Sequence, residues 1–137
     1  MKYFLANTII RGYIKRLKEK NVAVFVRSVF LQGVFFLEPD KITDPLLIKY
    51  AKPYIEILRD YCKTGNMSIA EFAISYIRDV EGVTSLVLGA DTKEQVMENI
   101  KYINAPSISE ETRAELSEKF REVNITKIME VLSRPKK

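Results

Sequence analysis

The sequence has 137 residues, of which 47% are hydrophobic and 29% are charged, and its formal net charge is +4. This length fits one domain, and the chain is too apolar and too weakly charged to be disordered. It contains no histidine and a single cysteine, Cys62. These counts exclude a Ser-His-Asp triad, a Cys-His nucleophile and a structural zinc site within these residues. The lone cysteine favours a reducing compartment.

Neither a membrane nor a nucleic acid is an expected partner. The longest apolar stretch, 29–37, is far shorter than the ~20 residues that a membrane span needs. The first six residues do not resemble a signal peptide. Basic residues gather within 15–20 and 134–137 without the interleaved aromatic rings that stack on bases, which favours solvated helix faces. We therefore expect a soluble, cytoplasmic protein.

Short apolar runs alternate with amphipathic helices in the first half of the chain. The predicted elements are a strand over 3–6, a helix over 9–20 ended by Asn21, and a strand over 22–26. The last of these is continuously apolar, as in strands buried on both faces of a sheet. A long connection follows, and Pro45 and Pro53 mark the starts of two further helices.

The second half continues the alternation. Ser68 and Glu71 have the spacing of a capping box that opens a helix, and Gly82 ends this helix. Residues 83–88 predict a second buried strand. Asp91 and Glu94 repeat the capping-box spacing and predict Asp91 at the N-terminus of the next helix. Two more helices are predicted, starting at Ser109 and near Ile125.

These elements make about three strands and six helical segments in parallel alternation, with no linker that divides residues 1–137 into two domains. Three parallel strands form a poor sheet on their own, because both edges and one face need cover. The sequence therefore predicts a single α/β unit that is part of a larger structure.

Polar and glycine-containing segments follow both clear strands, over 27–33 and 89–99. Ligands of α/β proteins gather at the carboxyl ends of strands, where loops converge and helix N-termini offer N–H groups to phosphates. Each segment is therefore a candidate binding site. For the second segment an ordinary turn, with Asp91 acting only as a helix cap, explains the same residues equally well.

Three segments together resemble the aldo-keto reductases. They are Val-Arg-Ser-Val-Phe-Leu-Gln-Gly (26–33), Ser-Ile-Ala-Glu-Phe-Ala (68–73) and the run from Gly82 to Asn99. Their order and spacing match the last part of that family's chain, over most of residues 20–123. In the family pattern G-x-S-x-x-x-Q-x-x-x-N, the positions here are Gly89, Asp91, Gln95 and Asn99, of which Asp91 departs.

The resemblance implies a partial (β/α)8 TIM barrel, with about three parallel strands and their helices, equivalent to the sixth to eighth strands of the family. Family members reduce aldehydes and ketones with NADPH, using an Asp, a Tyr, a Lys and a His from the first half of their chains. None of these four can be placed in this sequence. We therefore assign no catalytic residue, and no metal ligand.

The resemblance also implies a set of cofactor-binding residues. On the strand-end segment 27–33 they are Arg27, Ser28, Phe30, Gln32 and Gly33, along the nicotinamide and pyrophosphate. On the second segment they are Gly89, Ala90, Asp91 and Gln95 at the adenosine ribose, with Glu98 and Asn99 at the adenine. Arg27 stands where the family commonly places an aromatic ring that stacks on the nicotinamide.

Asp91 replaces the Ser or Thr with which the family usually holds the 2′-phosphate of NADPH. A carboxylate repels that phosphate and accepts a hydrogen bond from a free 2′-hydroxyl. The resemblance therefore implies an NAD(P)(H) site that prefers NAD(H), unless Asp91 is only a helix cap or the isolated chain binds no cofactor.

Two functions remain open. The chain is either a reductase fragment that carries the cofactor-binding half and is inactive alone, or a self-standing nucleotide-binding or assembly protein. In one form of the second function, the chain completes a barrel together with a separate N-terminal half. Because an isolated fragment exposes apolar surface, we expect a homo-oligomer or a complex with that half.

Other candidate residues are expected to be structural. Cys62 shares a helix face with apolar residues and is expected to be buried and unreactive. Tyr3, Tyr50, Tyr54 and Tyr76 are expected to be core residues. Asp79 and Glu81 are expected to form a polar helix end.

Overall fold

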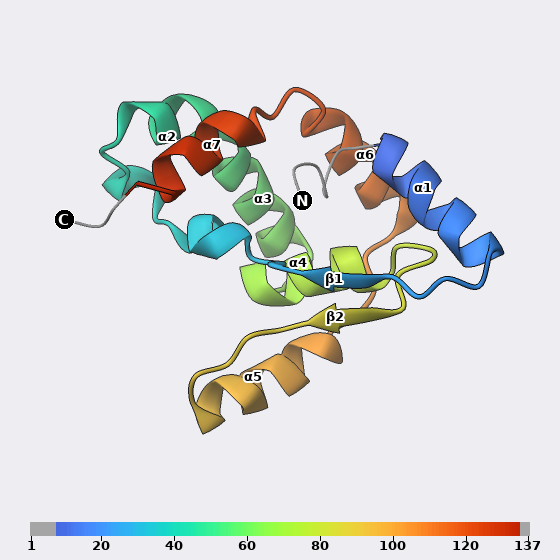
Figure 1. Cartoon of the computed structure of the whole chain (residues 1–137). Helices are drawn as coiled ribbons and strands as arrows, with labels where there is room; N and C mark the ends of the chain where they lie inside the picture. The colour runs from blue at the N-terminus through green and yellow to red at the C-terminus, as the bar shows by residue number, and fades with distance from the viewer. Residues whose placement is uncertain (1–7, 135–137) are drawn as a thin grey trace.

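The computed structural model describes residues 8–134. In chain order its elements are α1 (Thr8–Glu19), β1 (Phe25–Arg27), the 3-10 helices η1 (Leu31–Phe36) and η2 (Pro39–Lys41), α2 (Pro45–Tyr50), α3 (Lys52–Thr64), α4 (Ile69–Arg78), β2 (Ser85–Val87), α5 (Lys93–Ile103), α6 (Glu110–Lys119) and α7 (Ile125–Leu132), as Figure 1 shows. Every helix predicted from the sequence has a counterpart. The strand predicted over 3–6 and Tyr3 lie outside the described residues.

The two strands pair in parallel, with Phe25, Val26 and Arg27 opposite Ser85, Leu86 and Val87. Both are shorter than the predicted strands over 22–26 and 83–88. Before β1, the N–H of Val24 donates to the hydroxyl of Thr84 at 2.9 Å. Because a side chain takes this bond, the regular backbone ladder begins only at Phe25.

The prediction that both strands are buried on both faces is wrong. Val26 is 4% exposed, whereas Phe25 on the opposite face is 65% exposed and Val87 is 54% exposed. A continuous apolar run shows that both faces of a strand are apolar, but it does not show that another element packs on each face. Within residues 8–134, the core covers only the face that carries Val26.

Local capping signals set most helix ends. Asn21 takes a left-handed φ of 55° just after α1. The Asp44 side chain accepts from two N–H groups at the start of α2. The Ser68–Glu71 capping box opens α4 as predicted, with both of its bonds formed. However, α4 ends at Arg78, and Gly82, with φ +94°, instead shapes the turn that leads to β2.

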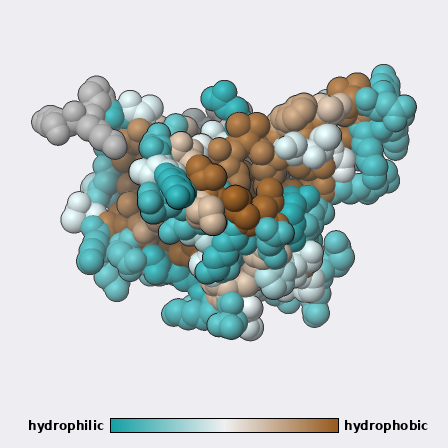
Figure 2. Space-filling view, turned by 90° about the horizontal axis from the view of Figure 1, so that it is seen from below, coloured by the Kyte–Doolittle hydropathy of each residue, from teal (hydrophilic) through white to brown (hydrophobic). Residues whose placement is uncertain are grey.

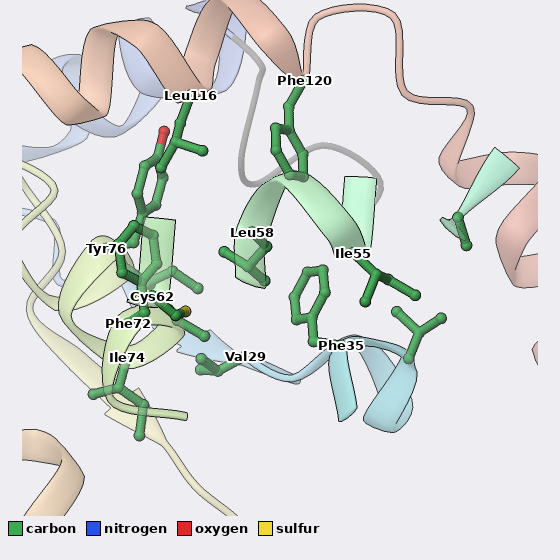
Figure 3. Packing of buried hydrophobic residues seen from close by; sticks show 14 of the residues in the cluster. Val29, Phe35, Ile55, Leu58, Cys62, Phe72, Ile74, Tyr76, Leu116 and Phe120 are labelled. Carbon is green, nitrogen blue, oxygen red and sulfur yellow. The ribbon is translucent and has the colours of Figure 1, made fainter. Parts of the chain in front are cut away.

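The core lies between the helices on one side of the sheet, as Figure 3 shows. α3 contributes Ile55, Leu58 and Cys62, α4 contributes Phe72, Ile74 and Tyr76, and α6 contributes Leu116, with Phe120 directly after it. The segment after β1 adds Val29 and Phe35, and α7 adds Ile128. This core fixes the segment that follows β1 against α3 and α4.

α5 and the open face of the sheet leave large apolar side chains exposed. On the strands these are Phe25 and Val87, and on α5 they are Val96, Met97, Ile100 and Ile103, between 39% and 65% exposed. Figure 2 shows hydrophobic residues gathered on the side of the molecule seen from below in Figure 1, the side where β2 and α5 lie. Among residues 8–134, no helix has the length and apolar character needed to cross a membrane.

Candidate functional site

The two candidate segments start side by side. Arg27, the last residue of β1, is paired with Val87, the last residue of β2, in a parallel register. The candidate segments 27–33 and 89–99 therefore begin at neighbouring points of the carboxyl edge of the sheet. Figure 1 shows both segments running from this edge toward the same side of the molecule before they separate. This is the position where parallel sheets collect ligands.

The segment after β1 alternates anchored and exposed residues. Val29 is 5% exposed and belongs to the core, and the Phe30 ring packs edge-on against Phe36 with their centroids 5.2 Å apart. Arg27, Ser28 and Gln32 are exposed. The core therefore holds the segment while its polar side chains face solvent.

Left-handed backbone angles shape this segment. The φ of Ser28 is 58°, that of Gln32 is 53° and that of Gly33 is 84°. A Cβ added at Gly33 would meet nothing within 4 Å, so the conformation, and not a lack of space, favours glycine there. Such strained residues hold only where their surroundings enforce them, and they concentrate at functional sites.

The predicted helix cap after β2 is displaced by one residue. α5 begins at Lys93, and its N-cap is Thr92, whose hydroxyl accepts from the N–H of Gln95 at 3.3 Å. The prediction that Asp91 caps this helix together with Glu94 is therefore wrong. The sequence has the capping spacing twice, at Asp91 with Glu94 and at Thr92 with Gln95. The structure forms the Thr92 half of the second pair, while the Gln95 side chain accepts from Asp91 instead of from Thr92.

Two side chains of α5 fold the loop back onto the helix. The N–H of Asp91 donates to Gln95 Oε1 at 2.6 Å, and Asn99 Nδ2 donates to the carbonyl oxygen of Gly89 at 3.2 Å. Gln95 and Asn99, two of the residues that define the motif, therefore shape the loop itself. The Asp91 carboxylate takes no part in these bonds, and Asp91 is exposed, as are Gly89, Ala90 and Glu98.

The sequence matches the model of one protein family. The model described as "Aldo/keto reductase family" matches residues 3–121, which is most of the chain. The chain belongs to the aldo/keto reductase family. It is therefore related to oxidoreductases with TIM-barrel-like α/β folds that generally bind NAD(P)H. The two parallel strands and the helices of residues 8–134 are consistent with part of such a barrel. Among curated proteins, no sequence matches.

The geometry of the chain fits the adenosine side of the cofactor of an aldo/keto reductase in part. The loop 89–92 is exposed, its backbone is held by α5, and the Asp91 carboxylate can accept bonds from ribose hydroxyls. Gln95 Oε1 and Asn99 Nδ2 are already engaged within the chain. These two side chains would therefore support the site, and each bonded atom keeps one further position, a lone pair on Gln95 Oε1 and an N–H on Asn99 Nδ2, for a ligand.

Arg113 is a buried arginine that none of the sequence motifs predicted. Arg113 of α6 is 4% exposed and donates to the carbonyl oxygens of Tyr76 at 2.7 Å and Ser75 at 2.9 Å. Its position was visible in the sequence, since Arg113 shares the i, i+3, i+7 face of Leu116 and Phe120, both of which are core residues.

The remaining candidates are structural, as predicted. Cys62 is 5% exposed, and burial raises the pKa of its thiol to about 11. Tyr76 is fully buried, and Tyr50 and Tyr54 are half-buried against the core. Asp79 forms an ion pair with Arg78 at 2.6 Å, and Glu81 with Lys18 at 3.2 Å. Each carboxylate therefore has a cationic partner.

Proposed function

We propose that this chain forms the cofactor-binding side of a carbonyl reductase that uses NAD(H). The observation that carries the proposal is the pairing of Arg27 with Val87, because it starts both candidate segments at adjacent points of one sheet edge. When bound, the nicotinamide cofactor supplies the hydride for carbonyl reduction.

Each of the two candidate segments is proposed to contact a different part of the cofactor, and segment 27–33 contacts the nicotinamide and the pyrophosphate. Ser28, Gln32 and Gly33 lie along the nicotinamide and pyrophosphate, where left-handed angles turn the backbone sharply. The Arg27 guanidinium stacks on the nicotinamide in place of an aromatic ring. Phe30, already packed on Phe36, supports this stretch.

On the second segment, the proposed ribose and adenine contacts surround the start of α5. Gly89 and Ala90 allow a close approach of the ligand to the backbone, and the exposed Asp91 carboxylate faces the ribose. Gln95 holds the loop that carries Asp91, and Glu98 and Asn99 flank the adenine.

Asp91 sets the proposed preference for NAD(H). Its carboxylate is released from capping because Thr92 caps α5, so it can accept a bond from the 2′-hydroxyl and it repels a 2′-phosphate. Calorimetric titration should give NADH at least about tenfold tighter binding than NADPH, a difference of about 1.4 kcal/mol. Asp91→Ser should remove most of this difference.

A matched control tests whether the effect belongs to the site. Glu122→Gln removes the same charge at an exposed position between α6 and α7 and should leave the preference unchanged. Tighter binding of NADPH than of NADH to the wild-type chain would overturn the proposed preference.

We also propose that these 137 residues have no reductase activity alone, since they contain no histidine and no match to the family's four catalytic residues. The expected result is no NADH-dependent turnover of aldehydes or ketones above the rate without protein. Turnover that persists after chromatographic repurification would contradict this part of the proposal.

A second protein chain is proposed to cover the exposed apolar face of β1, β2 and α5, either another copy or an N-terminal half-barrel. Contiguous apolar patches of this kind mark interaction surfaces. Sedimentation should show a mass above that of the monomer, and Ile100→Glu should reduce it, whereas Thr126→Glu, which adds the same charge on α7, should not. A stable wild-type monomer would exclude the second copy and leave the half-barrel, which co-expression tests.

The exposed face also supports a second candidate function, that of an assembly protein. A chain that associates through this face but binds neither NADH nor NADPH would support assembly and refute the proposed cofactor role.

A further inference from the structure

Apolar packing holds α5 only weakly. None of its residues is fully buried, and Val96, Met97 and Ile100 are 47%, 60% and 52% exposed. Tyr102, near its C-terminal end, is the half-buried α5 residue that packs on the core. α5 lies beside α4. Since burial of apolar area is the main force that docks a surface helix, and these side chains bury little of theirs, a polar attachment adds to this packing.

Arg78, the last residue of α4, provides one. Its Nη1 donates to the carbonyl oxygens of Ile103 and Ala105, both at 2.7 Å, and its Nη2 donates to the Ser107 hydroxyl at 3.2 Å. Ile103 ends α5, so its carbonyl is among those that a helix cannot satisfy internally. A cation at this end also interacts favourably with the helix dipole.

The Arg78 side chain is itself fixed in place. Asp79 accepts from Arg78 Nε at 2.6 Å and from Nη2 at 2.9 Å, a two-point contact that sets the plane of the guanidinium. Arg113 lies behind this pair, 3.7 Å from Asp79, and is bonded to the backbone of α4. The C-terminal ends of α4 and α5 are thus joined through a braced arginine.

We propose that Arg78 is a positioning residue for the nucleotide site. By fixing the C-terminal end of α5, it determines where the other end of the helix holds Asp91, Gln95 and Asn99 relative to the segment after β1. Arg78 touches no part of the proposed site, and this inference rests on the proposed cofactor role.

Hydrogen exchange tests the attachment without any ligand. In Arg78→Ala, the amides of α5 should exchange at least about tenfold faster, while those of α3 and α4 change less, because the loss of a local attachment favours local opening. Arg121→Ala, which removes an exposed arginine paired with Glu118 three residues earlier in the chain, is the control and should exchange like the wild type. Unchanged exchange in α5 of Arg78→Ala would overturn the proposal.

A double-mutant cycle with NADH separates positioning from a general loss of stability. Asp91→Ala should weaken NADH binding severalfold in the wild type but have a clearly smaller effect in Arg78→Ala, because the carboxylate is then no longer held in place. Additive effects would overturn the positioning role. If Arg78→Ala does not fold, Arg78→Lys, which keeps the charge but not the two-point contact, undergoes both measurements with the same expected directions.

The two proposals fail in different ways. A wild-type chain that binds no NADH refutes the cofactor role, and with it the positioning role. The exchange data still decide whether Arg78 holds α5.

Discussion

Gly82 lies directly against Ile14. A Cβ built on Gly82 would stand 2.8 Å from Ile14 Cγ2 and 3.0 Å from its carbonyl oxygen, and the φ of Gly82 is +94°. The turn before β2 is therefore closed by the backbone of α1, the helix that precedes β1. Both the contact and the backbone angle require glycine here.

Gly82→Ala should lower the free energy of unfolding by about 2 kcal/mol or more, since it combines backbone strain with a clash against main-chain atoms. Urea unfolding provides the measurement. Gly33→Ala separates the two causes, because Gly33 also has a positive φ but an added Cβ there meets nothing within 4 Å. An equal loss in both variants would show that contact with Ile14 contributes nothing.

Thr92→Ala should lower stability by about 1 kcal/mol, because Thr92 is the N-cap of α5. Thr92→Ser keeps the hydroxyl and should change stability little, because serine caps helices at least as well as threonine. Asp91→Ala should change the urea midpoint little, since the bond at Asp91 involves its backbone N–H. A larger loss from Asp91→Ala than from Thr92→Ala would return the capping role to Asp91.

Asp79 predicts sensitivity to acid. Its hydrogen bond from Arg78 holds the pKa of the carboxyl below its ordinary value. This stabilisation is present above the pKa of the unfolded chain, about 3.9, and is lost as pH falls through the lower folded pKa. The urea midpoint of the wild type should therefore fall below about pH 4. Asp79→Asn should be less stable at pH 6 and lose less on acidification, and parallel curves would contradict this.

Cys62 predicts sensitivity to alkali. Burial raises the pKa of the thiol from 9.0 to about 11 in the folded chain. The contribution of this thiol to stability is therefore fully present below pH 9. It is lost as the pH rises toward 11, because the unfolded chain ionises its thiol first. The difference in unfolding free energy between the wild type and Cys62→Ala should shrink over this range. Rapid modification of native Cys62 by iodoacetamide at pH 8 would contradict the burial itself.

Helices were more predictable from the sequence than the sheet was. The capping residues Ser68, Glu71 and Asn21 act through neighbours in the chain, so their spacing alone carries the information. The exposure of Phe25 and Val87 depends instead on which layers cover the sheet, and an apolar run looks the same whether a second layer is present or absent.

At the candidate site, the sequence located the two segments but not their internal bonding. Asp91 and Thr92 offer equivalent capping signals one residue apart, and only the backbone course after β2 decides between them. The roles of Arg78 and Arg113 were not predicted because each arginine bonds to carbonyl oxygens of residues distant in the chain, and every residue carries such an oxygen, so no motif records them.

The one-residue displacement of the α5 cap separates two tasks that neighbouring residues often share. Thr92 anchors the helix start, while Asp91 is held through its N–H alone, a bond that every residue except proline can keep. The charge at position 91 can consequently change without altering the start of α5. Substitutions there, whether arising by drift or introduced by engineering, can explore ligand preference at little risk to folding.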